Sequence, residues 1–184
     1  QEYVADFPTG RYNLGNYYSK LNDFTRAEEN YKEAIVIDNL FYPAKINLAI
    51  LYYQEGKVDP AEELFLDLIK NHPEAQDGYY YLALLYGEQK KYPEAISLLE
   101  TASTKSNRNP RVFYNLGLLY QMTNQYTKCE NSFLKGLQLE PCNFDLLYAM
   151  FVFQTKQNDK IKATSYLGKL KSCYPNNKQV QELR

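Results

Sequence analysis

Few side chains in this sequence have the types and spacing that catalysis or metal binding needs. The lone histidine, His72, precedes Pro73 in an expected surface turn and has no serine, cysteine or aspartate at the spacing of a catalytic set. The three cysteines, Cys129, Cys142 and Cys173, lack the spacing of metal ligands and leave an odd count, so neither a metal site nor a disulfide framework is expected. No glycine-rich phosphate loop occurs. The sequence therefore predicts a protein that is not an enzyme and that needs no cofactor.

The dominant pattern is a repeat. Leu-Gly/Ala-x-x-Tyr recurs at a fixed step of 34 residues, beginning at Leu14, Leu48, Leu82 and Leu116, and a degraded fifth copy begins at Met150. A constant period in this range is typical of stacked two-helix units. We therefore expect an all-α protein of stacked antiparallel helix pairs, whose stability comes from neighbouring units as well as from each unit alone.

The period divides the chain into five units, in which we number positions 1 to 34. Residues 178–184 follow as a C-terminal capping helix or as the start of a further repeat, with Val180 and Leu183 as its apolar contacts. The expected repeats span residues 8–41, 42–75, 76–109, 110–143 and 144–177.

Two apolar stripes in each unit predict its two helices. Positions 4, 7, 8 and 11 follow the spacing of one buried helical face, and positions 20, 24 and 27 form a second stripe. This places helices at about positions 1–14 and 18–30 of each unit. Position 15 should end the first helix in the left-handed conformation, because four of its five residues are asparagine or glycine. A capping box is expected at the second helix, from Thr25, Asp59 or Thr127 at position 18 to Glu28, Glu62 or Glu130.

Composition and charge narrow the class of protein. The net charge of −1 argues against a nucleic-acid binder, and no apolar run is long enough to span a bilayer. Charge is uneven, however, with 17 acidic and 11 basic residues up to residue 109, then 5 acidic and 10 basic residues. This gradient is read either as solubilising charge or as steering of a polarised partner. No secretory signal is found at the start, and the sequence leaves the compartment open between the cytoplasm and the periplasm of a bacterium.

With these residue types at the repeat positions given above, the sequence resembles the tetratricopeptide repeat family over residues 8–177. The resemblance implies a right-handed superhelix, an α-solenoid, which acts as a protein-binding scaffold. Departures occur at position 4, where Arg11 is expected at an exposed edge and Lys45 with a buried stem and its charge at the rim. The fifth unit departs with Phe151 at position 8 and Gln154 at position 11, as terminal repeats often do.

The resemblance also implies where a partner binds, since first helices line the concave surface of such a superhelix. Positions 5, 9 and 12 then form an apolar groove lined by tyrosines, suited to a peptide or protein segment. Ordinary packing between repeats is the competing interpretation of the same tyrosines. The expected partner-binding residues are Tyr12, Asn16, Ile46, Tyr53, Tyr80, Leu84, Tyr114, Leu118 and Tyr148.

Some members of the family clamp a C-terminal carboxylate with lysine, arginine and asparagine side chains. Here Asn16 and Asn47 hold the two asparagine positions, but the cationic positions hold Tyr12, Asp77 and Tyr81. Because a buried carboxylate would lack its charged partners, we predict that no such clamp forms.

Two alternatives to a free scaffold stay open. Residues 41–48 and 143–149 bear a fainter resemblance to repeat arms of bacterial multihaem cytochrome chains, although no Cys-x-x-Cys-His motif occurs to attach a haem. The chain would then be a structural or regulatory arm of a larger enzyme or electron-transfer protein. The other alternative is self-association through Tyr53, Tyr80 or the exposed ends.

Overall fold

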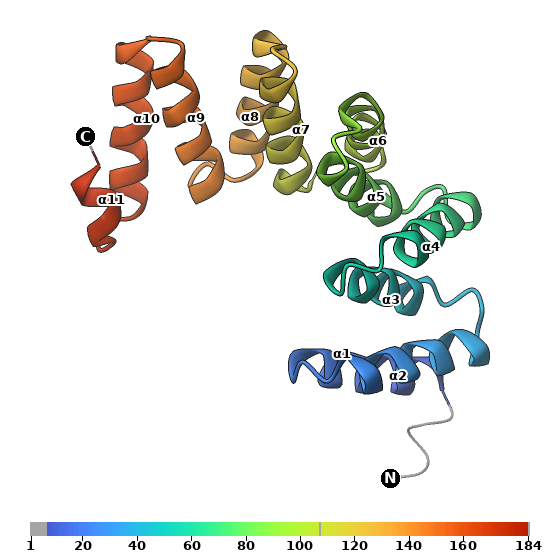
Figure 1. The fold of residues 1–184 in the computed structure, drawn as a ribbon. Coiled ribbons are helices and arrows are strands. Elements are labelled where there is room, and N and C mark those ends of the chain that lie inside the picture. Colours follow the sequence, from blue (N-terminus) through green and yellow to red (C-terminus); the bar gives the residue numbers. More distant parts are fainter. Residues whose placement is uncertain (1–6, 107, 184) are drawn as a thin grey trace. The chain divides into compact units, whose positions relative to one another are not determined.

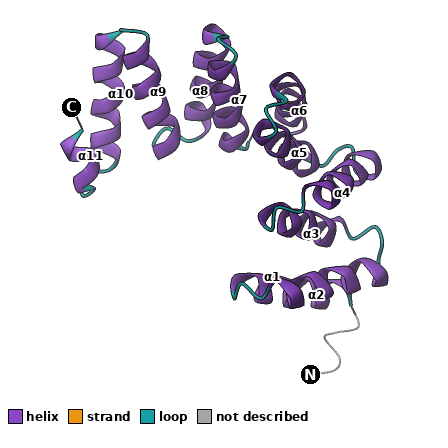
Figure 2. Cartoon of the chain, viewed as in Figure 1, coloured by secondary structure: helices purple, strands orange, loops and turns teal. Residues whose placement is uncertain are grey.

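The computed structural model describes residues 7–106 and 108–183, and these residues form helices joined by short turns, with no strand among them (Figures 1 and 2). Eleven helices lie in the described ranges. They are α1 (Pro8–Lys20), α2 (Phe24–Ile37), α3 (Tyr42–Gln54), α4 (Val58–Asn71), α5 (Gln76–Glu88), α6 (Tyr92–Lys105), α7 (Pro110–Met122), α8 (Tyr126–Leu139), α9 (Phe144–Lys156), α10 (Lys160–Cys173) and α11 (Lys178–Glu182).

The helices follow the 34-residue period closely. First helices occupy positions 1–13 and second helices positions 17–30, within a residue of the expected bounds. Position 15 has a positive φ in every unit, from 58° at Asn22 to 73° at Gly56, and Lys90 adopts it as well at 61°. The turn thus fixes this backbone conformation even where the residue type does not favour it. The expectation of an all-α fold built from helix pairs is confirmed.

The capping-box prediction is wrong. Second helices begin at position 17, so Thr25, Asp59 and Thr127 lie inside the helix instead of before it. The residue that caps α2 is Asp23, whose carboxylate accepts the Arg26 amide at 3.2 Å, and Asp159 caps α10 in the same way at 3.0 Å. The glutamates of the expected boxes have another partner, described below.

Contacts divide the chain into two compact units, Gln1–Leu98 and Leu99–Arg184, which meet within α6. In the first unit, α1 packs on α2, α3 on α4, and the pairs pack on each other through α2 and α3. Gly15 permits the close approach of α1 and α2, because a Cβ there would lie 2.5 Å from the Tyr31 ring. The core continues through fully buried Ala27, Phe65 and Leu82.

Of the charged residues at position 4, Lys45 lies as expected, whereas Arg11 is half-buried and not at an exposed edge. The Lys45 side chain is 13% exposed, and its ammonium pairs with the Asp67 carboxylate at 2.6 Å. Arg11, on the first helix, pairs with Glu33 at 2.7 Å. A buried stem with a paired charge at its tip allows lysine at a position that otherwise holds apolar side chains.

In the second unit, α7 packs on α8, α8 on α9, and α9 on α10. Gly117 again meets a ring, since a Cβ there would lie 2.2 Å from Phe133. The short helix α11 covers α10 with Val180, which is 1% exposed against Leu147 and Leu170. A short helix therefore follows the fifth repeat, and whether it caps the repeats or begins a further one stays a prediction; Arg184 lies outside the described residues.

A disulfide joins Cys142 to Cys173, with their Cα atoms 5.6 Å apart. This corrects the expectation that the cysteines form no disulfide. The odd count misled, because Cys129 is free and fully buried at position 20, where the repeat needs a small side chain. Cys142 and Cys173 form the bond, and their spacing in the sequence alone does not reveal that they lie close together.

Candidate partner-binding surface

The position-5 residues of the first unit are packed more deeply than a binding ladder would suggest. Tyr12 is half-buried on α1, with its ring edge-on to Phe41 at a centroid distance of 5.6 Å. Ile46 and Tyr80 are each only 8% exposed, and the Tyr80 ring contacts Tyr81 at 5.1 Å. Only a small part of the surface of these side chains is accessible to a partner.

Asn16, at position 9 of the first repeat, is the centre of a polar cluster. Its side-chain oxygen accepts the Tyr31 hydroxyl at 2.8 Å and the Asn47 amide at 2.6 Å. Beside it, α1 and α3 frame a recess of about 340 Å³. That recess is lined by Asn16, Ser19, Lys20, Tyr31, Asn47, Ile50, Leu51 and Gln54. The two asparagines that match a carboxylate clamp are thus bonded to each other, and Lys20 is the one cation among the residues that line the recess.

Tyr53 and Leu84 complete the expected residues of the first unit. Tyr53 is half-buried, and its hydroxyl donates to the Glu88 carboxylate. Burial, followed by this bond, raises the pKa of Tyr53 far above its ordinary value, so the hydroxyl stays a donor. Leu84 is half-buried on α5.

The second unit contains Tyr114, Leu118 and Tyr148. Tyr114 is half-buried, and burial together with the charge of Asp145 raises the pKa of its hydroxyl. It lines a recess of about 430 Å³ with Arg108 and Arg111. Leu118 borders an apolar recess of about 500 Å³ that is lined by Leu118, Gln121, Met122, Tyr126, Lys156 and Gln157. Tyr148 is 41% exposed and stacks on Phe144.

The nine expected residues therefore fall into two sets. Six belong to the first unit and three belong to the second. Asn16 and Leu118 border recesses, Tyr148 is exposed, and Ile46 and Tyr80 mainly pack. Whether any of them contacts a partner stays a prediction.

Sequence reasoning missed a polar link that recurs between consecutive repeats. The position-11 side chain donates to the glutamate at position 21 of the preceding repeat, as Tyr52 does to Glu28 at 2.9 Å and Tyr86 to Glu62 at 2.8 Å. Gln154 makes the same link to Glu130 at 2.8 Å, although it replaces the tyrosine. The separation of 24 residues was visible in the sequence, but the glutamates had been assigned to helix capping.

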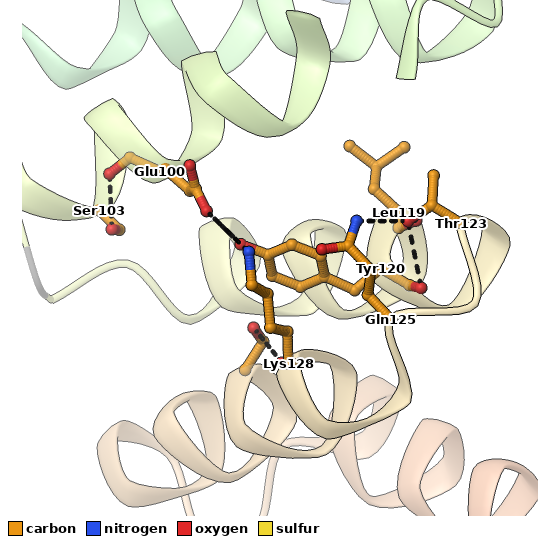
Figure 3. Close-up of polar contacts among 8 residues, drawn as sticks. Glu100, Ser103, Leu119, Tyr120, Thr123, Gln125 and Lys128 are labelled. Carbon is orange, nitrogen blue, oxygen red and sulfur yellow. Dashed lines mark hydrogen bonds and ion pairs between the residues drawn. The ribbon is translucent and has the colours of Figure 1, made fainter. Parts of the chain in front are cut away.

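Tyr120 shows how the link survives a substitution. Its usual acceptor position holds Ile96, and the hydroxyl donates instead to Glu100, one helical turn further along α6, at 2.5 Å (Figure 3). Lys128 lies over the Tyr120 ring, 5.2 Å from its centroid. Burial, then the Glu100 carboxylate, raises the pKa of Tyr120 well above its ordinary value. The hydroxyl of Tyr120, a residue that is 5% exposed, thus still finds an acceptor.

The residues considered for chemistry are not brought together. His72 ends α4, where its ring contacts Tyr42 at 5.1 Å, so it is half-buried and not at the surface as expected. Among the described residues, no group of three or more histidine, cysteine or acidic side chains could hold a metal ion. The same residues include no helix with the length and hydropathy of a membrane span.

Helix pairs at a 34-residue step, with a small residue at position 8 against a ring at position 24, define a helical repeat protein. Sequence profiles described as tetratricopeptide repeat match residues 9–39, 46–110 and 110–142. The chain belongs to the tetratricopeptide repeat family. Repeats of this family generally mediate protein–protein interaction and are typically non-catalytic.

Curated relatives are longer proteins. The chain is 27% identical over 168 residues to the TPR repeat-containing protein MJ1428 of Methanocaldococcus jannaschii, a match that covers 85% of this chain and 30% of that protein. It is 26% identical over 173 residues to human protein O-mannosyl-transferase TMTC1, covering 92% of this chain and 20% of that protein. The chain thus spans less than a third of either relative.

Solved structures share the fold. The structure of PilF from Pseudomonas aeruginosa has a TM-score of 0.82 at 22% identity, over 94% of this chain and 79% of that one. YrrB, described as a TPR protein with an unusual peptide-binding site, has a TM-score of 0.70 at 18% identity, over 96% of this chain and 91% of that one. At these identities the likeness concerns the fold alone.

Proposed function

We propose that this chain is a non-catalytic interaction module, which binds a peptide or protein segment on the face formed by its first helices. The observation that carries the proposal is a recess at equivalent places in both units. Positions 9, 12 and 13 of one repeat and position 13 of the next line the recess in each case. These positions are Asn16, Ser19, Lys20 and Gln54 in the first unit, and Leu118, Gln121, Met122 and Lys156 in the second.

The two recesses differ in the chemistry that they offer. The first combines the Asn16–Asn47 pair with the lysine of position 13, which suits a hydrogen-bonding backbone or side chain. The second is bordered by Leu118, Met122 and Tyr126, of which the last two are exposed. Exposed methionine and tyrosine offer adaptable contact area to an apolar side chain. The first recess therefore matches a segment with polar groups, and the second recess matches a segment with apolar side chains.

Selection from a phage-displayed peptide library on the immobilised chain tests this proposal. Peptides that bind are measured by fluorescence anisotropy against the variants Ile50→Asp and Leu118→Asp, which place a charge in each recess. We expect at least one variant to weaken binding by about tenfold or more, which is about 1.4 kcal/mol. Tyr114→Ala should cost ~1–2 kcal/mol of binding if its half-buried ring is an anchor.

Val36→Asp is the matched control, since Val36 lies on the second helix α2 and is 85% exposed. Circular dichroism confirms that each variant keeps its helices. Unchanged affinity in Ile50→Asp, Leu118→Asp and Tyr114→Ala together would refute the first-helix face as the binding surface.

The lengths of the relatives favour a second candidate, a repeat arm of a larger protein. Less than a third of each relative is matched, and one of them is named as an O-mannosyl-transferase. In such an arm the partner segment would belong to the same polypeptide. The parent reading frame distinguishes the two, because a catalytic or haem-binding module encoded beside these repeats would support the arm.

A further inference from the structure

The Cys142–Cys173 bond is unused by the proposed binding function and lies at a defined place in the repeat. Cys142 is in the turn between α8 and α9, and Cys173 is the last residue of α10. The bond therefore closes a loop that contains the whole fifth helix pair. Cys173 also packs beside the small terminal cluster of Leu147, Leu170 and Val180.

The two sulfur-bearing residues differ in access. Cys142 is exposed, whereas Cys173 is half-buried. A recess of about 590 Å³ opens beside Cys142. It is lined by Leu139, Pro141, Phe144 and Tyr174 together with the polar residues Glu140, Asn143 and Asp145. An external thiol can thus reach the exposed Cys142 residue through an opening whose lining is partly apolar and partly acidic.

We propose that the Cys142–Cys173 disulfide is a reversible redox modification site whose reactant is a dithiol, either a small molecule or the active site of a thiol–disulfide oxidoreductase. A thiolate of the dithiol attacks the Cys142 sulfur, a mixed disulfide forms, and Cys173 leaves as a thiolate that takes up a proton. The second thiol of the reactant then displaces Cys142. Two electrons and two protons pass from the dithiol to the protein, and the dithiol becomes a disulfide.

The structure indicates which contacts remain after the disulfide is reduced and which helices then loosen. Without the bond, the α8–α9 turn and the end of α10 stay linked by the Tyr174 hydroxyl, which donates to the Cys142 carbonyl at 2.5 Å, and by the Phe144 and Tyr174 rings. The buried residues of α10 are Ala163 and Leu170, whereas α8 buries Cys129, Ser132, Phe133 and Gly136. A helix with so thin a core depends more on its covalent tie, so α10 and α11 should loosen on reduction.

The third cysteine provides an internal control. Cys129 is 0% exposed, and burial, with a smaller contribution from the charge of Glu130, raises the pKa of its thiol to about 12. Because thiolates and not thiols react, Cys129 stays inert while the helices hold together. Labelling of Cys129 would therefore report unfolding of α8, and labelling of the other two alone would report a local reaction.

The test uses the full chain, purified without reductant and then exposed to dithiothreitol or to reduced thioredoxin. Alkylation and mass spectrometry should show Cys142 and Cys173 blocked before treatment, labelled after it, and blocked again on reoxidation, with Cys129 unlabelled throughout. Hydrogen exchange of α10 and α11 amides should quicken by about tenfold or more, while exchange in α7 and α8 stays unchanged. The Cys142→Ser/Cys173→Ser variant should show the faster exchange without treatment and should not respond to the dithiol.

Three results would overturn the proposal. They are free thiols at Cys142 and Cys173 before treatment, reduction that occurs only when Cys129 is labelled too, and reduction that leaves the exchange of α10 and α11 unchanged. None of these depends on a binding partner, so the proposed interaction function stands or falls separately.

Discussion

The first and the last repeat each have a face on which no further helix pair is described, and they treat that face differently. Leu14 and Tyr17 on α1 are 37% and 57% exposed, and Leu21, which directly follows the helix, is 59% exposed. At the same two repeat positions as Leu14 and Tyr17, Leu48 and Leu51 of the second repeat are 4% and 1% exposed under the preceding helix pair. After the fifth repeat, α11 instead covers α10 with Val180, and the disulfide ties α10 back to the preceding turn.

The packing of the two helices inside each of these repeats shows the opposite contrast. The first helix pair is tightly packed, with Gly15 against the Tyr31 ring and Tyr31 only 2% exposed. In the fifth pair the large residue is at position 8, where Phe151 is half-buried, and Leu167 at position 24 is half-buried too. A glycine packed under a ring thus accompanies an uncovered outer face at one end. At the other end, partly exposed residues at positions 8 and 24 accompany a covalent tie and the helix α11.

The largest effect should come from removing the tie. The Cys142→Ser/Cys173→Ser variant loses the closure of a loop of about 30 residues, which by chain entropy costs ~3–4 kcal/mol. This loss should appear in the free energy of local opening of α10 and α11, measured by native-state hydrogen exchange. A loss spread equally over α7 and α8 would contradict a role confined to the last repeat.

The next effect contrasts two glycines. Gly15→Ala should destabilise the first repeat by ~1–3 kcal/mol, because the new methyl group would overlap the Tyr31 ring. Gly168→Ala, in α10, meets nothing within 4 Å and should stabilise the helix by ~0.5–1 kcal/mol. Urea denaturation of both variants measures the difference, and equal signs would refute the contrast in packing.

A third prediction concerns the link that the two ends share. Tyr52→Phe removes the donor to Glu28, and Gln154→Met removes the donor to Glu130, at the first and last junctions. Each should cost ~1.5–3 kcal/mol, the usual net value of a hydrogen bond to a charged group. A double-mutant cycle with alanine at each glutamate isolates the interaction energy of the pair. A coupling energy near zero at the last junction would mean that Gln154 does not stabilise the fold as the tyrosine does at the first junction.

The sequence predicted the architecture because equivalent residues of successive 34-residue units pack in the same way. Leu48 and Leu82 are buried alike, and position 15 turns alike even at Lys90, so one pattern determined ten helices. The sequence did not reveal that Gln154, which is 2% exposed, donates to Glu130 in place of a tyrosine, because a pattern of residue types does not record which atom donates. The disulfide was missed because Cys142 and Cys173 hold different positions, 33 and 30, in consecutive repeats.

The expected binding residues were harder to predict for a related reason. Helical spacing places a residue on the first-helix face, but it does not say how far the neighbouring repeat covers it. Tyr80 and Tyr148 share position 5, yet they are 8% and 41% exposed. The spacing also does not say which rings of the same repeat lie beside each tyrosine, and these are Tyr81 beside Tyr80 and Phe144 beside Tyr148.

The link at the first junction should also depend on pH. Lys32, whose ammonium lies 2.7 Å from the Glu28 carboxylate, is the main cause that lowers the pKa of Glu28 below its ordinary value of 4.5, with Tyr52 and Lys57 adding to it. A lowered folded-state pKa stabilises the fold above the unfolded-state pKa, and this contribution is lost as the pH falls below about 4.5. Glu28→Gln should therefore be less stable than the wild type at pH 7, by a difference that shrinks toward pH 3. Urea midpoints at both values measure it, and a constant difference would assign the effect to shape and not to charge.

The smallest effect on stability should come from the uncovered face of α1. Tyr17→Ser and Leu21→Gln remove side chains that are more than half exposed, so each should change the free energy of unfolding by no more than about 0.5 kcal/mol. Leu48→Ala, at the repeat position that Leu14 holds on α1, should cost ~2–5 kcal/mol because it is covered. Sedimentation adds a second readout. If copies of the chain associate through this face, the Tyr17→Ser/Leu21→Gln variant should remain monomeric at concentrations where the wild type does not. A large loss of stability in that variant would mean that the face is covered in solution, and the contrast between the two ends would disappear.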